Sequence, residues 1–153
     1  MNTGANVTIR RGTVAECVAI SQQIPEFYDG IYDEKDYETR LFNTNSLVLV
    51  ALDGSTPVGF KVGYQRDNDG SFYSWMGGVI PDYRKLHIAQ KLADTQEAWA
   101  VEKGFNAIVF KTRNSLKGML IFAIKNGFCI EAVERKEAIE DYRIIFRKKL
   151  KNI

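Results

Sequence analysis

The stretch GGVIPDYRKLHIAQKL, residues 77–92, begins like the end of a strand and continues like a helix from about Ile88. The first backbone N–H groups of a helix have no partner within it, and the helix dipole places roughly half a positive charge at the same end. The segment 84–89 therefore predicts an anion site, for which a pyrophosphate is a natural guest. The alternative is an ordinary helix start, at which Arg84 and Lys85 are surface cations.

Apolar periodicity, caps and turns define the elements that must position this segment. A capping box at Thr13 and Glu16 opens the first helix, and Pro25 stops it. Turn residues at 53–54 and 66–70 predict that three β-rich runs form an antiparallel meander. In chain order we expect strands at 7–10, 46–53, 56–65, 71–79, 107–112, 128–135 and 141–150, and helices near 13–24, 33–42, 88–103 and 115–126.

The strand, long helix and strand over 71–112 form a βαβ unit, whose two strands should run parallel with a right-handed crossover. The sequence therefore predicts an α/β fold of the α+β mixed-sheet type, mostly antiparallel, with one parallel βαβ unit and about four helices. Ligands bind at the carboxyl ends of strands in open α/β sheets. The candidate anion site lies at such an end.

Composition narrows the classes of partner and compartment. The 153 residues fit a single domain over 1–153, and 21 basic residues are balanced by 19 acidic ones, so we expect no nucleic-acid partner. Cys17 and Cys129 have no paired spacing, so we expect neither a disulfide nor a metal site. The apolar runs are too short to span a bilayer and the N-terminus has no apolar leader, which favours a cytoplasmic protein without a membrane partner.

The segment from Val79 onward resembles the GCN5-related N-acetyltransferase (GNAT) family. The loop pattern of that family is Arg or Gln, any two residues, Gly, any one residue, and then Gly or Ala. In this sequence Arg84 and Ala89 match the first and last positions, and His87 replaces the middle glycine. KTRN, ending at Asn114, and KNGF, ending at Phe128, resemble the second family signature. The order of elements is similar across nearly the whole chain. The resemblance implies the GNAT acyl-CoA N-acyltransferase fold.

The resemblance further implies acetyl-CoA as co-substrate. In the family, backbone N–H groups of the loop hold the pyrophosphate, and the pantetheine arm lies between two parallel strands, here 71–79 and 107–112. Carried over, Gly78 and Val79 border the pantetheine and the acetyl carbonyl, which the Val79 N–H polarises. The loop donors and the residues on the far side of the arm are Arg84, Lys85, Leu86, His87, Ile88, Ala89, Asn114 and Phe122.

His87 is the only histidine and invites a role as a base. Its place in the loop favours a phosphate neighbour instead. A side chain there costs nothing if the backbone keeps right-handed angles, and costs stability if φ is positive.

Acetyl transfer to an amine needs a group that takes a proton and a route for protonating the departing thiolate. The family often has Glu on the third meander strand, and the matching position is Tyr73, which can orient a water or simply pack. The family often has a Tyr as the general acid that protonates the thiolate. The matching position here is Ile121 or Ala123, with Phe122 between them. Another hydroxyl serves, or the thiolate leaves unaided. A covalent route through either cysteine has no visible partner group.

The segment PEFYDGIYDEKDYE, residues 25–38, corresponds to the variable acceptor wall of the family. Its acidic and aromatic residues suit a cationic amine through charge pairing and cation–π contact, with Tyr28, Tyr32, Asp33 and Glu34 as the acceptor-binding candidates. The alternative is a solvated helix face.

We therefore expect an acetyl-CoA-dependent N-acetyltransferase that acts on a small-molecule or peptide amine by direct attack. The alternative is a degenerate family member that binds acyl-CoA as a sensor or regulator, which the absent Glu and Tyr would explain. A third reading is an unrelated α/β binding module. A homodimer is an expectation by analogy with the family.

Overall fold

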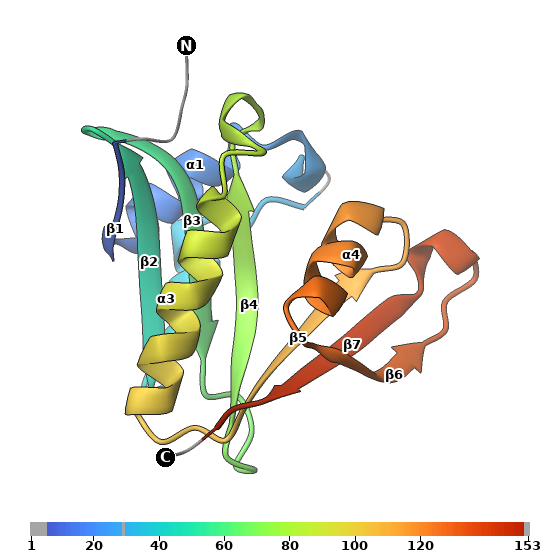
Figure 1. Ribbon diagram of the computed structural model, residues 1–153. Helices are drawn as coiled ribbons and strands as arrows, with labels where there is room; N and C mark the ends of the chain where they lie inside the picture. The colour runs from blue at the N-terminus through green and yellow to red at the C-terminus, as the bar shows by residue number, and fades with distance from the viewer. Residues whose placement is uncertain (1–5, 29, 152–153) are drawn as a thin grey trace.

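The computed structural model describes residues 6–28 and 30–151 (Figure 1). Short 3₁₀ turns lie at Pro25–Phe27, Pro81–Tyr83 and Ile139–Asp141. In the described ranges, no helix has the length and apolar character required to cross a bilayer. The other elements are β1 (Val7–Arg11), α1 (Val14–Ser21), α2 (Glu34–Leu41), β2 (Ser46–Asp53), β3 (Thr56–Tyr64), β4 (Ser71–Val79), α3 (Ile88–Glu102), β5 (Ala107–Arg113), α4 (Lys117–Lys125), β6 (Cys129–Glu134) and β7 (Arg143–Lys149).

The seven strands form one sheet in the order β1-β2-β3-β4-β5-β7-β6. Neighbouring strands are antiparallel except for β4 and β5, which run parallel. The antiparallel meander of β2, β3 and β4 and the parallel unit of β4, α3 and β5 are thus confirmed. The mixed α/β fold class predicted from the sequence is confirmed as well.

The main departures from the expected helix bounds occur where 3₁₀ turns replace helical turns. Helix α1 starts after the Thr13 capping box as predicted, but it ends at Ser21 because Gln23 and Ile24 donate to carbonyls three residues back. Helix α4 starts at Lys117 instead of 115, since the preceding residues form a turn after β5. Neither change moves a candidate site residue to another element.

The helices cover the two faces of the sheet in pairs. Helices α1 and α2 pack on one face, where Ile20 and Tyr37 join a core with Phe60 of β3. On the opposite face, Leu92 of α3 and Ala123 of α4 pack over separate clusters. Figure 1 shows α3 over the β1–β4 half and α4 over the half that contains β5, β7 and β6.

A β-bulge interrupts the pairing of β3 and β4. Met76 pairs with Val62 and Ser74 pairs with Gly63, so Trp75 is the additional residue on β4. A Cβ at Gly63 would lie 2.4 Å from Cε2 of Phe72, so the bulge brings the two strands too close for any other residue at this position. Bulges bend and twist a strand. Here the bulge lies in the middle of β4, beside the candidate site.

Candidate functional site

The edge of β4 that faces β5 is only partly occupied by strand pairing. Parallel pairing joins Ser71–Tyr73 to Ala107–Val109 and extends no further, and Figure 1 shows β5 diverging from β4. The N–H of Ile80 donates to β3. Because N–H directions alternate along a strand, the N–H groups of Gly77 and Val79 point away from β3, toward the unpaired edge. This edge therefore carries two parallel donors without a strand partner.

The turn between β4 and α3 carries a second group of donors. In the part of the chain that the structure describes, the N–H groups from Lys85 to Gln90 have no acceptor, and the first bond at the helix start runs from Lys91 to the carbonyl of His87, 3.0 Å. Lys85 and His87 are left-handed, with φ of 65° and 63°. Such residues turn neighbouring N–H groups toward one concavity, which suits an anion. The positive end of the α3 dipole adds to this preference.

His87 is the N-cap of α3, and its exposed side chain makes no capping hydrogen bond. Its φ of 63° is the angle at which glycine carries no steric penalty. A histidine here costs roughly 1 kcal/mol. The left-handed backbone at this position explains why the family pattern has glycine there. In this chain His87 adopts the same conformation, with backbone strain.

Arg84 has other partners in the structure. Its guanidinium makes two bonds to the Glu26 carboxylate, at 2.8 and 2.9 Å, and Nε donates to the carbonyl of Val79 at 3.1 Å. The guanidinium lowers the pKa of Glu26. The backbone N–H of Arg84 donates to the carbonyl of Pro81. Arg84 thus braces the loop after β4, and its contact with a phosphate stays a prediction.

Helix α4 lies on the other side of the unpaired edge and is joined to α3. Gln90 at the start of α3 donates to the Asn126 side chain at 2.6 Å. Asn114 donates its side-chain N–H to the carbonyl of Ile139 at 3.2 Å, and Phe122 on α4 is half-buried. The cofactor roles of Asn114 and Phe122 stay predictions, as do those of Leu86, Ile88 and Ala89 in the loop.

Aromatic residues gather on the α1/α2 face of β4. The rings of Tyr73 and Tyr64 meet edge to face at 5.8 Å, and Arg66 stacks over Tyr73 at 4.0 Å. Burial raises the pKa of the Tyr73 phenol. At neutral pH Tyr73 therefore remains protonated, which suits a hydrogen-bond donor or a residue that orients a water better than a base. Its catalytic assignment stays a prediction.

The structure brings together only some of the residues predicted to form the acceptor wall. Tyr32 lies beside Trp75, with ring centroids 5.1 Å apart, whereas Tyr28 is 59% exposed. The Asp33 carboxylate caps α2 by accepting the N–H of Asp36 at 2.8 Å, and Glu34 is exposed in the first helical turn. A cavity of about 280 Å³ runs along this helix, lined by Tyr32, Lys35, Asp36, Thr39 and Arg40. The wall therefore carries cations as well as acids.

Lys61 of β3 is a residue that the sequence reasoning missed. It pairs with Gly77, is partly buried, and has no ion-pair or hydrogen-bond partner among the described residues. Burial lowers the pKa of its ammonium to about 8. The available sequence signal was a lysine with glycines two residues before and after it, Gly59 and Gly63, which leave room on its own face of the strand.

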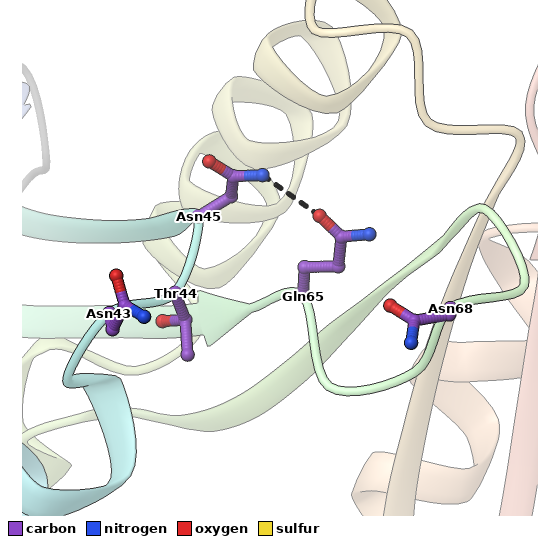
Figure 2. Close-up of a pocket in the computed structure, with 5 residues that line it drawn as sticks. All are labelled: Asn43, Thr44, Asn45, Gln65 and Asn68. Atoms are coloured by element: carbon purple, nitrogen blue, oxygen red, sulfur yellow. Dashed lines mark hydrogen bonds between the residues drawn. The ribbon is translucent and has the colours of Figure 1, made fainter.

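Another cavity, of about 340 Å³, lies near the opposite end of β4 from Val79. Figure 2 shows its lining, in which Asn45 donates to Gln65 at 2.8 Å. Its side chains are uncharged amides and one hydroxyl: Asn43, Thr44, Asn45, Gln65 and Asn68. They offer no group for acid–base or nucleophilic chemistry at neutral pH, so this cavity is not the candidate site.

The two cysteines lie apart from these features. Cys17 is fully buried on α1, and burial raises the pKa of its thiol to about 12. Cys129 is exposed on the edge strand β6. A thiol with so high a pKa supplies almost no thiolate at neutral pH, so Cys17 is unsuited to a covalent route.

Comparison with known proteins identifies the family. The sequence profile described as the Acetyltransferase (GNAT) family matches residues 15–128, well over half of the 153 residues. The chain belongs to this family. The resemblance drawn from the loop and the Asn signature is thereby confirmed, together with the class of enzyme, an acyltransferase with acetyl-CoA as co-substrate. A search among curated proteins finds no match.

Solved structures share the whole fold. The ribosomal-protein-S18-alanine N-acetyltransferase of Escherichia coli is 14% identical, with a TM-score of 0.81 over 94% of each chain. The PaiA N-acetyltransferase of Thermoplasma acidophilum, in complex with coenzyme A, is 19% identical, with a TM-score of 0.74 over 94% of this chain and 98% of that one. YncA of Salmonella typhimurium, solved with acetyl-CoA, is 19% identical, with a TM-score of 0.75 over 97% and 96%. At such identities these likenesses show the fold alone.

The strain at His87 leads to a first prediction. His87→Gly should raise the free energy of unfolding by about 1 kcal/mol, because glycine adopts a φ of 63° without steric cost. Ala89→Gly, two residues on in right-handed helix, should lower it by about as much. Urea unfolding of both variants measures the difference. Equal destabilisation by the two glycines would contradict the account of strain.

A second prediction concerns stability against pH. The Lys61 pKa is about 8 in the folded protein and near 10.4 in an unfolded chain. Between these values the unfolded state binds more protons, so the free energy of unfolding rises with pH. Relative to Lys61→Met, the wild type should gain on the order of 2 kcal/mol over this range. Urea unfolding at several pH values compares the two proteins, and parallel curves would contradict the depressed pKa.

Proposed function

We propose that the chain transfers the acetyl group of acetyl-CoA to a primary amine by direct attack of the amine on the thioester. The observation that carries this proposal is a pair of backbone donor groups without partners among the described residues. One group is Gly77 and Val79 on the free edge of β4, and the other is the left-handed turn before α3, from Lys85 to Gln90. An extended arm that ends in a pyrophosphate fits these two groups, since amide acceptors suit the strand edge and phosphate oxygens suit the turn.

The residues present fit the co-substrate. The N–H groups of Lys85–Ala89 would hold the pyrophosphate, and Gly78 and Val79 would border the pantetheine arm from β4. From the β5 side, Asn114 would bond the pantetheine amides and Phe122 would flank them. When bound, the co-substrate supplies an activated acyl group. The chain has only to orient this group and to stabilise the charge that moves.

A backbone N–H on β4 would donate to the acyl oxygen, on which negative charge develops during attack. Val79 is the donor implied by the family pattern. Gly77 is a second candidate, because its N–H points to the same edge and lies closer to the bulge at Trp75. The exposed backbone of Gly77 leaves the approach to this donor open.

The sequence of β4, SFYSWMGGV, contains no Asp or Glu. This strand therefore offers no carboxylate that could take a proton from the amine. Tyr73 remains protonated and would hold a water that carries the proton away. The amine must be uncharged when it attacks, so a cationic acceptor would first lose a proton through this water.

The acceptor would approach from the α1/α2 face, beside Trp75 and Tyr32. Asp33 and Glu34 at the start of α2 would attract a cationic amine, and the exposed Tyr28 would offer a ring to it. Lys35 and Arg40 along the same helix favour an acceptor that also carries a polar or anionic group. A small molecule or a peptide end meets this description.

Thiol release from acetyl-CoA in the presence of amines, polyamines, amino acids, aminoglycosides and peptides tests the proposal. We expect saturable binding of acetyl-CoA, with release stimulated by at least one of these amines. Saturable binding without stimulated release across the panel would favour the acyl-CoA sensor, a reading that the absent carboxylate on β4 supports. Failure to bind acetyl-CoA would reject both readings.

A third prediction tests the turn before α3. Lys85→Glu should weaken coenzyme A binding about tenfold at low salt, because it places a negative charge beside the proposed pyrophosphate donors. Lys103→Glu, at the far end of α3, should leave the affinity unchanged. Calorimetric titration at two salt concentrations measures both, and equal effects of the two reversals would contradict a phosphate site at Lys85.

A fourth prediction tests the acceptor wall. Asp33→Asn combined with Glu34→Gln should raise KM for a cationic amine about threefold or more and leave KM for acetyl-CoA unchanged. Asparagine retains the cap on α2, so a loss of helix does not account for the change. Glu102→Gln, at the distant end of α3, is the matched control. An unchanged acceptor KM in the double variant would reject the wall.

A further inference from the structure

Lys61 lies at the centre of β3, directly opposite Gly77 of β4. Its Cγ is 3.5 Å from the position that a Cβ at Gly77 would occupy, so the stem of the lysine lies over the glycine. Gly77 belongs to the unpaired stretch of β4, and its N–H points to the free edge. From this position, the flexible remainder of the lysine side chain can extend toward the edge along which the acyl group is proposed to lie.

The lysine is on the α3 face of the sheet. A Cβ at Gly59, two residues before it, would meet Leu92 of α3, and one at Gly63, two residues after it, would meet Phe72 in the core below α3. Because side chains alternate along a strand, Lys61 points to the same face. Tyr73, in contrast, packs with the aromatic cluster that includes Trp75 on the α1/α2 face.

No charge compensates the ammonium in the described part of the molecule. Its cross-strand neighbours are Leu49 on β2 and Gly77 on β4. The buried residues of α3 above this face are also uncharged: Ile88, Leu92, Gln96 and Ala100. The buried amide nitrogen of Gln96 likewise has no hydrogen-bond partner. The Lys61 ammonium is therefore free to meet a ligand group that supplies an electron pair.

The reaction requires such a group at the sulfur. When the carbon–sulfur bond breaks, the sulfur leaves as a thiolate, and the tyrosine that often protonates it in the family is replaced by Ile121 or Ala123. We propose that the Lys61 ammonium donates its proton to the coenzyme A sulfur as this bond breaks, a role that rests on the acetyl transfer proposed above.

The proton and electron balance is complete without another reactant. The acceptor nitrogen forms the new bond to the acyl carbon, and the electron pair of the carbon–sulfur bond goes to sulfur. Sulfur receives the proton of Lys61, the product nitrogen loses one to water, and Lys61 regains one from solvent. With its pKa near 8 and that of a thiol near 8.5, the transfer is close to balanced in either direction.

The decisive experiment needs no acceptor. The thiol pKa of bound coenzyme A is measured from the pH dependence of the thiolate absorbance, in wild type, Lys61→Met and Lys61→Arg. An ammonium beside the sulfur stabilises the thiolate, so the bound thiol pKa should be at least one unit lower in wild type than in Lys61→Met. Lys61→Arg should keep the lower value, because the guanidinium remains charged.

Activity then separates proton donation from a purely electrostatic effect. With the best amine of the panel, or with water where none is found, thiol release in a single turnover should fall about a hundredfold in both variants. Arginine keeps the charge but holds its proton too tightly to donate it. Full activity in Lys61→Arg would overturn the donor role even if its thiol pKa were low.

The outcomes also distinguish this inference from the proposed function. Coenzyme A that binds equally to wild type and Lys61→Met, with the same thiol pKa in both, would overturn the role of Lys61 and leave acetyl transfer standing. Transfer of the acetyl group to Lys61 itself, seen by mass spectrometry after incubation with acetyl-CoA, would overturn it too, since an amide cannot donate that proton. Absence of coenzyme A binding would overturn both.

Discussion

The structure depends on the short length of the parallel pairing between β4 and β5. Three residues of each strand pair, and β4 then continues with only β3 as its partner. Unpaired N–H groups on a strand inside a sheet are costly unless a ligand or water meets them. The bulge at Trp75 bends and twists β4, and β7 pairs with β5 along its full length. The sheet thus keeps an internal edge open, and the proposed contacts of β4 with the pantetheine arm follow from it.

The elements were predictable because their signals are local. Capping boxes, turn residues and apolar periods act within a few residues, and they placed the meander and the βαβ unit correctly. The length of the β4–β5 pairing carries no local signal. The bond from Arg84 to Glu26 joins residues 58 positions apart, and no local pattern predicts it. Long-range choices of this kind depend on the packed structure.

The candidate site shows the same division at the level of single residues. The loop pattern correctly marked His87 as a departure from the family, but only the backbone shows that its φ is positive. Lys61 passed as an ordinary strand residue, because lysines on strands usually extend into water. It lies on the α3 face of the sheet and is partly buried, and the sequence places α3 above the sheet without fixing which strand residues it covers.

In the proposed reaction, the two faces of β4 divide the movement of protons. Tyr73 and the aromatic cluster lie on the face of α1 and α2, where the amine would arrive and lose its proton. Lys61 lies on the α3 face, and Gly77, which has no side chain, lies between Lys61 and the open edge. A side chain at Gly77 would separate the lysine from the edge, and an acidic residue beside Lys61 would raise its pKa by pairing with it. Under the proposed role of Lys61, the glycine and the uncharged buried residues of α3 would serve one purpose, which is to keep a weakly held proton next to the open edge.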